Sequence, residues 1–386
     1  MRKVACYKRI CYQLVKGNNL YCPYIEKGLT IENDGMMVPC CVFNDDLNFN
    51  IRKNTIKEYF ASEQYEQLNQ QFDNDIWPKG CASCEVAEKN KQLSLRQNAL
   101  PQKDLYSKQF IDLTIGNECN SDCVMCVPEN SSKILSRIRQ HGSPEDVEYT
   151  LDFDKNDWIN DDSLWQSLEE NINDIGCLKF LGGEPFLNKN IWKQLNRPGI
   201  QKHKQNINLM VTTNASILPS EKMEELQGWR SLLINASIDA SGKQFEWIRQ
   251  GLDWDTVSSN VQKINSLQNS IVSVSLVVSV YSIANVHHML EWVNNNDCLV
   301  YFNMLEKPPV MAINRAPVEI LEQTLSRLKG LKMNKVQNQI QLASLKNFIK
   351  KSIAENQYNP TVLNRMTDYY NRHRTYTMNT QTLEVE

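Results

Sequence analysis

The sequence predicts an α/β protein built on a mainly parallel sheet. Between residues 105 and 307, short apolar segments rich in β-branched residues alternate with amphipathic helical segments. Strands that alternate with helices run parallel, because each helix returns the chain to the same end of the sheet. Six strands are expected: 110–116, 177–181, 207–213, 232–239, 271–280 and 299–304. The helices expected between them include 158–170, 191–195, 221–226 and 256–267.

The 386 residues are enough for two or three domains. We expect a cysteine-rich N-terminal module at 1–104, the strand–helix domain at 105–307 and a helical segment at 308–386 that covers it. The net charge of -3 argues against a general polyanion binder. Because no apolar h-region follows Met1 and no apolar run approaches membrane-spanning length, we expect a soluble cytoplasmic protein. In that compartment, metal or cluster ligation explains most of the twelve cysteines better than disulfides do.

Three cysteines follow the first predicted strand of the strand–helix domain. Cys119, Cys123 and Cys126 have the spacing C-x3-C-x2-C, with no fourth cysteine in the same loop. Three thiolates can hold a cubane iron–sulfur cluster and leave one iron without a protein ligand, free to bind a small molecule. A zinc site usually takes four ligands, so the triad fits zinc poorly. The pattern therefore predicts a [4Fe–4S] cluster with one open iron.

The second predicted strand runs into a glycine turn. Residues 179–185 read Lys-Phe-Leu-Gly-Gly-Glu-Pro, and glycines allow a backbone to approach a ligand where a Cβ would block it. The cysteine triad and this turn, in this order and about one β–α unit apart, resemble the radical S-adenosylmethionine (radical SAM) superfamily. The resemblance implies a partial (β/α)6 TIM-type barrel, whereas the residues alone also allow a doubly wound sheet.

The resemblance also implies which residues meet SAM. The triad would hold the cluster, and the turn Gly182-Gly183-Glu184-Pro185 would receive the SAM amino group. Met125 occupies a position where many relatives have an aromatic residue that packs on the adenine. Polar residues at the ends of the third and fourth strands would contact the SAM carboxylate and ribose: Thr213, Asn214, Ser237 and Asp239. Asn214 and Asp239 could instead end a strand or cap the next helix.

A second cysteine set lies in the N-terminal module. Asp34-Gly35 predicts a hairpin turn, because this dipeptide accommodates positive φ. The hairpin would bring Cys22 and Cys40 to neighbouring positions, and Cys81-Ala82-Ser83-Cys84 is a typical two-ligand loop. Together they predict one four-cysteine site: Cys22, Cys40, Cys81 and Cys84.

The spacing of Cys22, Gly35 and Cys40 resembles the first half of the twitch and SPASM modules, which carry auxiliary clusters in many radical SAM enzymes. Those modules usually follow the catalytic domain, whereas this one precedes it. The resemblance implies a fully ligated auxiliary [4Fe–4S] cluster, with Cys41 as the alternative to Cys40. Two cysteine pairs around a hairpin also describe a zinc ribbon, so structural zinc stays open as an alternative.

The C-terminal segment adds a group of basic residues. They are Lys346, Lys350, Lys351, Arg365, Arg372, His373 and Arg374. The conservative interpretation is the solvated face of a helical cover over the barrel. A phosphate-bearing substrate is the alternative.

The leading functional hypothesis follows from the resemblance. One-electron reduction of the cluster would cleave SAM to methionine and a 5′-deoxyadenosyl radical, which abstracts a hydrogen from a substrate carbon. Such an enzyme needs an external one-electron reductant of the flavodoxin or ferredoxin type. A peptide or protein is the first substrate hypothesis, and a nucleotide or nucleic-acid base is the second. A non-catalytic zinc or cysteine-rich binding protein is the alternative of another class.

Overall fold

The computed structural model describes residues 20–90, 93–100, 105–151, 158–218 and 223–386. Its centre is an eight-stranded sheet in the order β10-β9-β7-β6-β5-β3-β1-β2. The six strands predicted for the barrel are present and mutually parallel: β3 (Gln109–Thr114), β5 (Ile175–Leu181), β6 (Asn208–Thr213), β7 (Ser231–Ser237), β9 (Ser270–Val278) and β10 (Leu299–Met304). Their order across the sheet follows the chain without the reversal of a doubly wound sheet. The partial (β/α)6 barrel is therefore confirmed.

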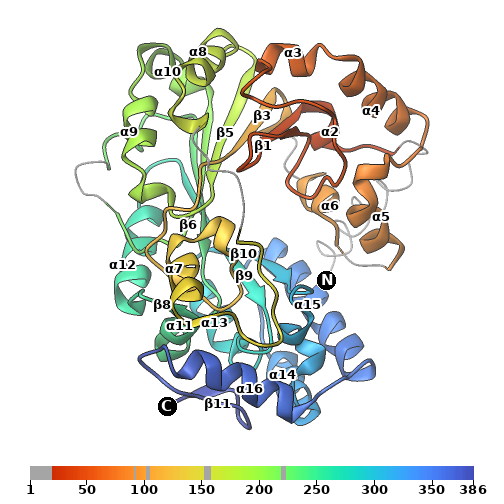
Figure 1. Cartoon of the computed structure of the whole chain (residues 1–386), viewed down its shortest axis with the longest axis vertical. Coiled ribbons are helices and arrows are strands. Elements are labelled where there is room, and N and C mark those ends of the chain that lie inside the picture. The colour runs from red at the N-terminus through yellow and green to blue at the C-terminus, as the bar shows by residue number, and fades with distance from the viewer. Residues whose placement is uncertain (1–19, 91–92, 101–104, 152–157, 219–222) are drawn as a thin grey trace.

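Helices connect these strands and cover the outer face of the sheet (Figure 1). They are α7 (Ser132–His141), α8 (Asp162–Glu170), α9 (Lys189–Leu195), α10 (Pro198–His203), α11 (Gly242–Ile248), α12 (Trp254–Asn265) and α13 (Val286–Asn295). The helices predicted at 158–170, 191–195 and 256–267 correspond to α8, α9 and α12. The one predicted at 221–226 is wrong as far as it can be followed: 223–226 form turns, and 221–222 lie outside the described residues.

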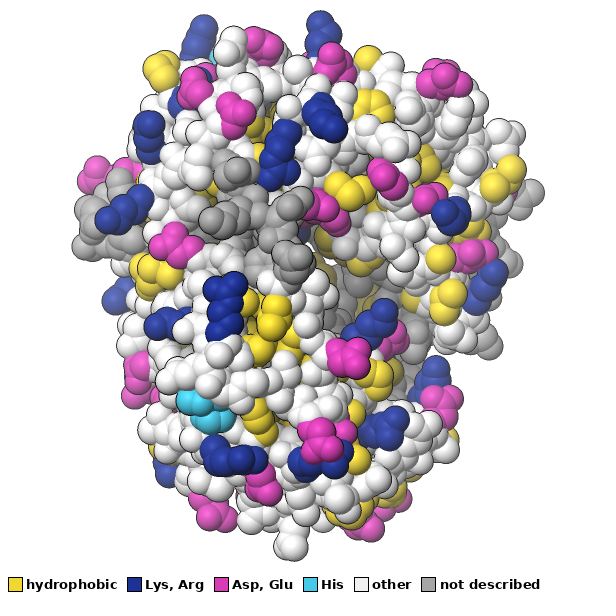
Figure 2. All heavy atoms as spheres, viewed as in Figure 1, with side chains coloured by type: hydrophobic (Ala, Val, Ile, Leu, Met, Phe, Trp, Pro, Cys, Tyr) yellow, Lys and Arg dark blue, Asp and Glu magenta, His cyan; other side chains and the backbone are white. Residues whose placement is uncertain are grey.

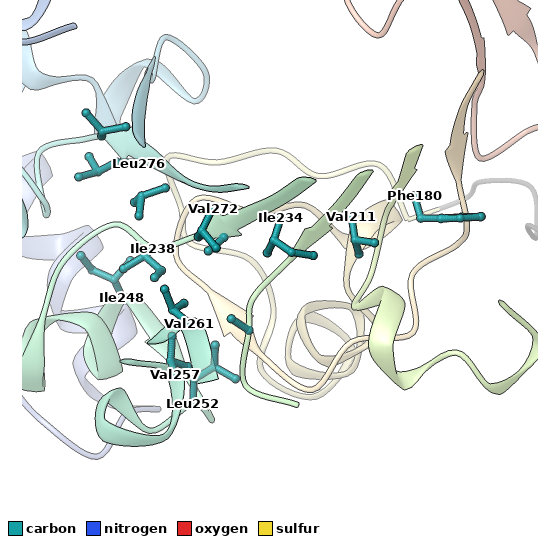
Figure 3. Close-up of a cluster of buried hydrophobic side chains, with 14 of the residues drawn as sticks. Phe180, Val211, Ile234, Ile238, Ile248, Leu252, Val257, Val261, Val272 and Leu276 are labelled. Carbon is teal, nitrogen blue, oxygen red and sulfur yellow. The ribbon is translucent and has the colours of Figure 1, made fainter. Parts of the chain in front are cut away.

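The two faces of the barrel sheet differ in chemistry. Phe180, Val211, Ile234 and Val272 occupy paired positions on four neighbouring strands and lie in a row (Figure 3). None of them is more than 3% exposed. The next residues along the strands point to the opposite face because side chains alternate in a strand. In β7 these alternate residues are only half-buried, which leaves the inner face of the barrel accessible.

The N-terminal module contributes two strands to the same sheet. β1 (Gly28–Ile31) pairs in parallel with β3 and in antiparallel with β2 (Met37–Val38). The predicted hairpin is confirmed, and Gly35 in its turn has a φ of 86°. Leu29 and Ile31 share one hydrophobic core with the barrel. The rest of the module is helical: α2 (Pro23–Lys27), α3 (Ile56–Phe60), α4 (Glu63–Asp73), η1 (Lys79–Cys81), α5 (Ala82–Lys89) and α6 (Leu95–Ala99).

The C-terminal segment packs at the end of the molecule opposite α3 and α8 (Figure 1). It consists of α14 (Val318–Lys329), α15 (Val336–Ala354), α16 (Pro360–Asn371) and the short antiparallel pair β11 (Met378–Asn379) and β12 (Glu384–Val385). Helix α15 protects the edge strand β10, since the side chain of Asn338 accepts a hydrogen bond from the Val300 N–H at 2.9 Å. Within the described ranges, none of the helices is both long and apolar enough to span a bilayer.

Candidate functional site

One cavity at the carboxyl ends of the barrel strands brings the two sequence motifs together. Its volume is about 320 Å³, within the size range of small-molecule sites. The predicted residues that line it are Cys119, Cys123, Met125, Cys126, Gly182, Gly183, Thr213, Asn214 and Ser237. Three others, Glu184, Pro185 and Asp239, are not among its lining residues. The cavity therefore combines three thiols with a glycine turn at the end of the sheet where barrels bind ligands.

A short strand pair fixes the cysteine loop. β4 (Asp122–Cys123) pairs in antiparallel with β8 (Arg249–Gln250), so that Cys123 lies opposite Arg249. The hydroxyl of Ser121 lies 3.3 Å from the Cys119 sulfur and 3.4 Å from the Cys123 sulfur. Burial raises the pKa of Cys123, and the nearby charge of Arg249 lowers it. A bound metal cluster would favour the thiolates further.

The C-terminal segment holds the same loop from the other side. The Arg374 guanidinium donates to the Asp122 carbonyl at 2.9 Å, and the Tyr370 hydroxyl donates to the Val124 carbonyl at 3.1 Å. Arg365 pairs with the Asp146 carboxylate at 2.5 Å. The predicted solvated basic face is therefore wrong for Arg374, whereas the Arg365 side chain stays 40% exposed. On the face drawn in Figure 2, positive and negative side chains are interspersed.

The glycine turn requires glycine at its second position. Gly183 has a φ of 53°, and a Cβ added there would lie 2.3 Å from the Glu118 carbonyl oxygen. The following N–H, from Glu184, donates to the same carbonyl at 2.8 Å. The turn therefore packs directly against the residue that precedes Cys119. This contact explains how two motifs more than sixty residues apart form one site.

The carboxylate of Glu184 supports the turn from below. It is 1% exposed and accepts hydrogen bonds from the Thr213 hydroxyl at 2.6 Å and the Asn214 N–H at 2.7 Å. Burial raises the pKa of Glu184, whereas these hydrogen bonds favour its ionised form. Pro185 is buried at the start of η5 (Pro185–Leu187). Both residues thus shape the turn rather than face the cavity.

Asp239 is engaged inside the protein. It is fully buried, and it accepts hydrogen bonds from the Arg249 Nε at 2.7 Å and from the Val277 N–H at 2.8 Å. Both carboxylate oxygens of this residue, expected to contact SAM, therefore have partners within the protein. Arg249 lines the cavity, and its Nη1 lies 3.6 Å from the Cys123 sulfur. In the sequence, Arg249 belongs to an aromatic-Ile-Arg stretch after the fourth barrel strand, a pattern that favours helix packing over contact with a cofactor.

The four predicted auxiliary cysteines also converge. Cys22, Cys40, Cys81 and Cys84 line one small cavity in the N-terminal module. Cys22 and Cys40 are 8% and 7% exposed. Burial raises the pKa of Cys22 to about 11 and that of Cys81 to about 12. Cys41 is not among the lining residues, and the charges acting on its thiol include Lys179 and Asp112 in the barrel. The geometry therefore favours Cys40 over Cys41.

An arginine lies beside this cavity too. Arg96 binds both carboxylate oxygens of Glu88, at 2.9 and 2.6 Å, and its guanidinium lies 5.4 Å from the centre of the Trp77 ring. Across the described part of the chain, no three Cys, His, Asp or Glu side chains are arranged to hold a single metal ion. Soft thiolate donors suit iron–sulfur clusters, and the side-chain-free glycine turn leaves room for a ligand beside the triad. The residues present therefore fit the groups that the resemblance implies.

Comparison with known families decides the class of the protein. Residues 113–293 match the Radical SAM superfamily, and residues 22–85 match the iron-sulfur cluster-binding domain named SPASM. The chain therefore contains a radical SAM domain preceded by a SPASM domain. Its family implies SAM, a SAM-binding [4Fe–4S] cluster and a further iron–sulfur site in the N-terminal module. The alternative of a non-catalytic binding protein is thereby wrong.

Solved structures of similar fold include SuiB of Streptococcus suis bound to S-adenosylmethionine, with a TM-score of 0.38 and 14% identity. That likeness covers 71% of this chain and 58% of SuiB, so this chain spans less than two thirds of the length of SuiB. SuiB bound to the precursor peptide SuiA gives a TM-score of 0.39 at the same identity and coverage. TYW1 with a lysine-pyruvate adduct bound gives 0.34 at 12% identity, over 82% of this chain and 91% of that one. No curated protein matches the sequence.

Proposed function

We propose that this radical SAM enzyme cleaves SAM reductively and abstracts a hydrogen from a carbon of a peptide or protein substrate. The observation that carries the proposal is the single cavity lined by all three triad thiols and by the glycine turn. When bound, the cluster and SAM supply the electron transfer, the sulfonium cleavage and the 5′-deoxyadenosyl radical. The chain supplies ligands, orientation and exclusion of water.

We assign the residues of this site as follows. Cys119, Cys123 and Cys126 hold the SAM-binding cluster, and the backbone of Gly182 and Gly183 receives the SAM amino group. Met125, Thr213, Asn214 and Ser237 face the cavity and are placed to contact the rest of SAM. Glu184 and Pro185 hold the turn in place. Asp239 acts through Arg249, because both of its oxygens already accept hydrogen bonds.

The N-terminal module would supply a second redox centre. We assign Cys22, Cys40, Cys81 and Cys84 to an auxiliary [4Fe–4S] cluster within a unit at 1–104, beside the barrel at 105–307 and the cover at 308–386. Because four thiolates complete the coordination of a cubane, this cluster would transfer electrons rather than bind SAM. A flavodoxin- or ferredoxin-type protein would provide the first electron. The cytoplasm, which keeps thiols reduced, is the expected compartment.

The inner face of the barrel supports a substrate with a polar backbone. Ser273 donates to the Asn235 side chain at 3.1 Å, and Asn303 donates to Ser275 at 2.7 Å. The ion pairs of Lys179 with Asp112, at 2.6 Å, and of Arg249 with Asp239 accompany these neutral groups. Neutral donors and acceptors on a partly open wall suit the amides of a peptide, which carry no charge to neutralise. Of the basic C-terminal residues, Arg374 binds the Asp122 carbonyl and the partly exposed Arg365 pairs with Asp146, so both already have protein partners.

Anaerobic reconstitution with iron and sulfide tests the enzymatic part of the proposal. The protein should gain brown visible absorbance and, with dithionite, convert SAM to 5′-deoxyadenosine and methionine. The triple variant C119A/C123A/C126A should retain only the auxiliary absorbance and release no 5′-deoxyadenosine. A wild-type protein that binds iron at the triad and leaves SAM intact would contradict the proposal.

A further inference from the structure

A buried arginine touches one ligand of the SAM-binding cluster. The Arg249 Nη1 lies 3.6 Å from the Cys123 sulfur, within hydrogen-bond reach of this large atom, and Arg249 is 8% exposed. The antiparallel pair β4–β8 places the two residues opposite each other, so the contact is set by the backbone. An arginine guanidinium keeps its proton in proteins, so a positive charge lies beside the sulfur.

A carboxylate limits this positive charge. The Asp239 side chain, 0% exposed, binds the Arg249 Nε at 2.7 Å and is itself fixed by the Val277 N–H at 2.8 Å. Sulfur, guanidinium and carboxylate thus form a chain of three groups buried at the wall of the cavity. At low dielectric each charge acts strongly on its neighbours.

We propose that Arg249 raises the reduction potential of the SAM-binding cluster through its contact with Cys123, and that Asp239 moderates this effect. The inference rests on the proposed function, since it requires the triad to hold a cluster. Reduction adds negative charge to the cluster, so a nearby cation and a hydrogen bond to sulfur favour the reduced form. The carboxylate of Asp239 opposes that stabilisation. Arg249 is a positioning and tuning residue, because it acts through Cys123.

The midpoint potential of the SAM-binding cluster should shift in opposite directions when Arg249 and Asp239 are changed. R249Q removes the positive charge and should lower the midpoint potential, with about a tenfold smaller reduction equilibrium constant, which is 59 mV for one electron. D239N leaves the arginine without its counter-charge and should raise the midpoint potential, with a severalfold larger reduction equilibrium constant. A general loosening of the loop would instead move both variants in the same direction. The opposite signs therefore separate tuning from structural damage.

The measurement is a redox titration of the reconstituted full-length chain in the absence of SAM, with electron paramagnetic resonance as the readout of cluster reduction. The auxiliary cluster in the same sample is the internal reference. R96Q is the matched control: it removes the arginine beside the four-cysteine site, and the potential of the SAM-binding cluster should stay at its wild-type value.

Three outcomes would overturn the inference. One is R249Q with an intact cluster and an unchanged potential, and the second is a shift of both variants in the same direction. The third applies if R249Q fails to take up a cluster: the inference is then overturned when the midpoint potential of D239N equals the wild-type value. Absence of a cluster from the wild-type triad would be a different failure, because it removes the proposed function as well.

Discussion

The two cysteine sites of this enzyme differ in how completely thiols enclose them. The three-cysteine site faces a cavity of about 320 Å³ that the glycine turn also lines. The four-cysteine site is a small cavity whose other lining residues are mainly apolar or aromatic, including Ile25, Phe72 and Trp77, together with Arg96. A missing thiol together with an open approach suits chemistry on a bound molecule. A complete thiol set inside a packed shell suits electron transfer.

The sites share one feature and use it differently. Each has a buried arginine paired with a carboxylate: Arg249 with Asp239, and Arg96 with Glu88. Arg249 lies within hydrogen-bond distance of the Cys123 sulfur. Arg96, besides its two hydrogen bonds to Glu88, donates from Nη1 to the Tyr21 carbonyl at 2.6 Å. The charge of Arg96 also counteracts the burial that raises the pKa of Cys22 and Cys81, so the sites differ in the contact of Arg249 with the Cys123 sulfur rather than in the presence of a nearby positive charge. The following changes test how separate the two sites are.

Removal of two thiols from either site should have the largest effect. C123A/C126A should lose about four irons per chain, because one cubane can no longer be held, and 5′-deoxyadenosine release should fall to background. C81A/C84A should lose a similar amount of iron but keep SAM cleavage in the absence of substrate. Iron analysis and chromatography of the SAM products check both. Loss of SAM cleavage in C81A/C84A with an intact triad cluster would show that the sites are not separable.

The ion pair between Asp112 and Lys179 lies where the two regions meet, since Asp112 on β3 pairs with Thr30 on β1. D112A should lower the free energy of unfolding by about 3–5 kcal/mol, because it leaves a buried ammonium without its partner. E26A, which breaks the exposed Glu26–Lys27 pair, should cost less than about 1 kcal/mol. Urea denaturation of the iron-free protein measures both. Equal losses of unfolding free energy in the two variants would contradict the view that the Asp112–Lys179 pair contributes more because it is less exposed.

The glycine turn gives a test specific to the SAM side. G183A should lower the free energy of unfolding by about 1–3 kcal/mol and weaken SAM binding at least about tenfold, because the new methyl group meets the Glu118 carbonyl. Gly242 is the matched control, with a φ of 58° and nothing within 4 Å of an added Cβ. G242A should cost only the strain of positive φ, about 1–2 kcal/mol, and leave SAM binding unchanged. Equilibrium dialysis against SAM separates the two variants, and similar losses of affinity would argue against the close-approach explanation.

Local patterns in the sequence were sufficient for much of this architecture. All six barrel strands lie within three residues of their predicted ends, because β-branched runs bounded by turn residues report local structure directly. The triad and the glycine turn lie together because both follow parallel strands at the same end of the sheet, and the β1–β2 hairpin brings Cys22 and Cys40 to one cavity.

Contacts between distant segments could not be predicted in this way. The pairing of β1 with β3 joins residues about eighty positions apart, and nothing local marks either edge as a partner. Asp239 was expected to contact the SAM carboxylate or ribose because its position at a strand end is visible in the sequence, whereas its pairing with Arg249 is not. Arg374 was interpreted as a surface charge for the same reason. A one-dimensional pattern shows that a charged residue is present but not what it binds.

The smallest expected effect concerns the C-terminal hold on the cysteine loop. Y370F removes the hydroxyl that binds the Val124 carbonyl at 3.1 Å, a loss of about 1 kcal/mol. If opening of this loop limits iron release, a chelator should remove iron from the three-cysteine site about fivefold faster, which corresponds to that energy at 25 °C. In the N-terminal module, the Tyr65 hydroxyl donates to the Glu26 carbonyl, so Y65F is the equivalent change beside the other site. Each variant should accelerate release from its own site only, followed as two separate phases of bleaching. Equal acceleration of both phases by Y370F would mean that the sites open together, and that the distinction between them is one of ligand number alone.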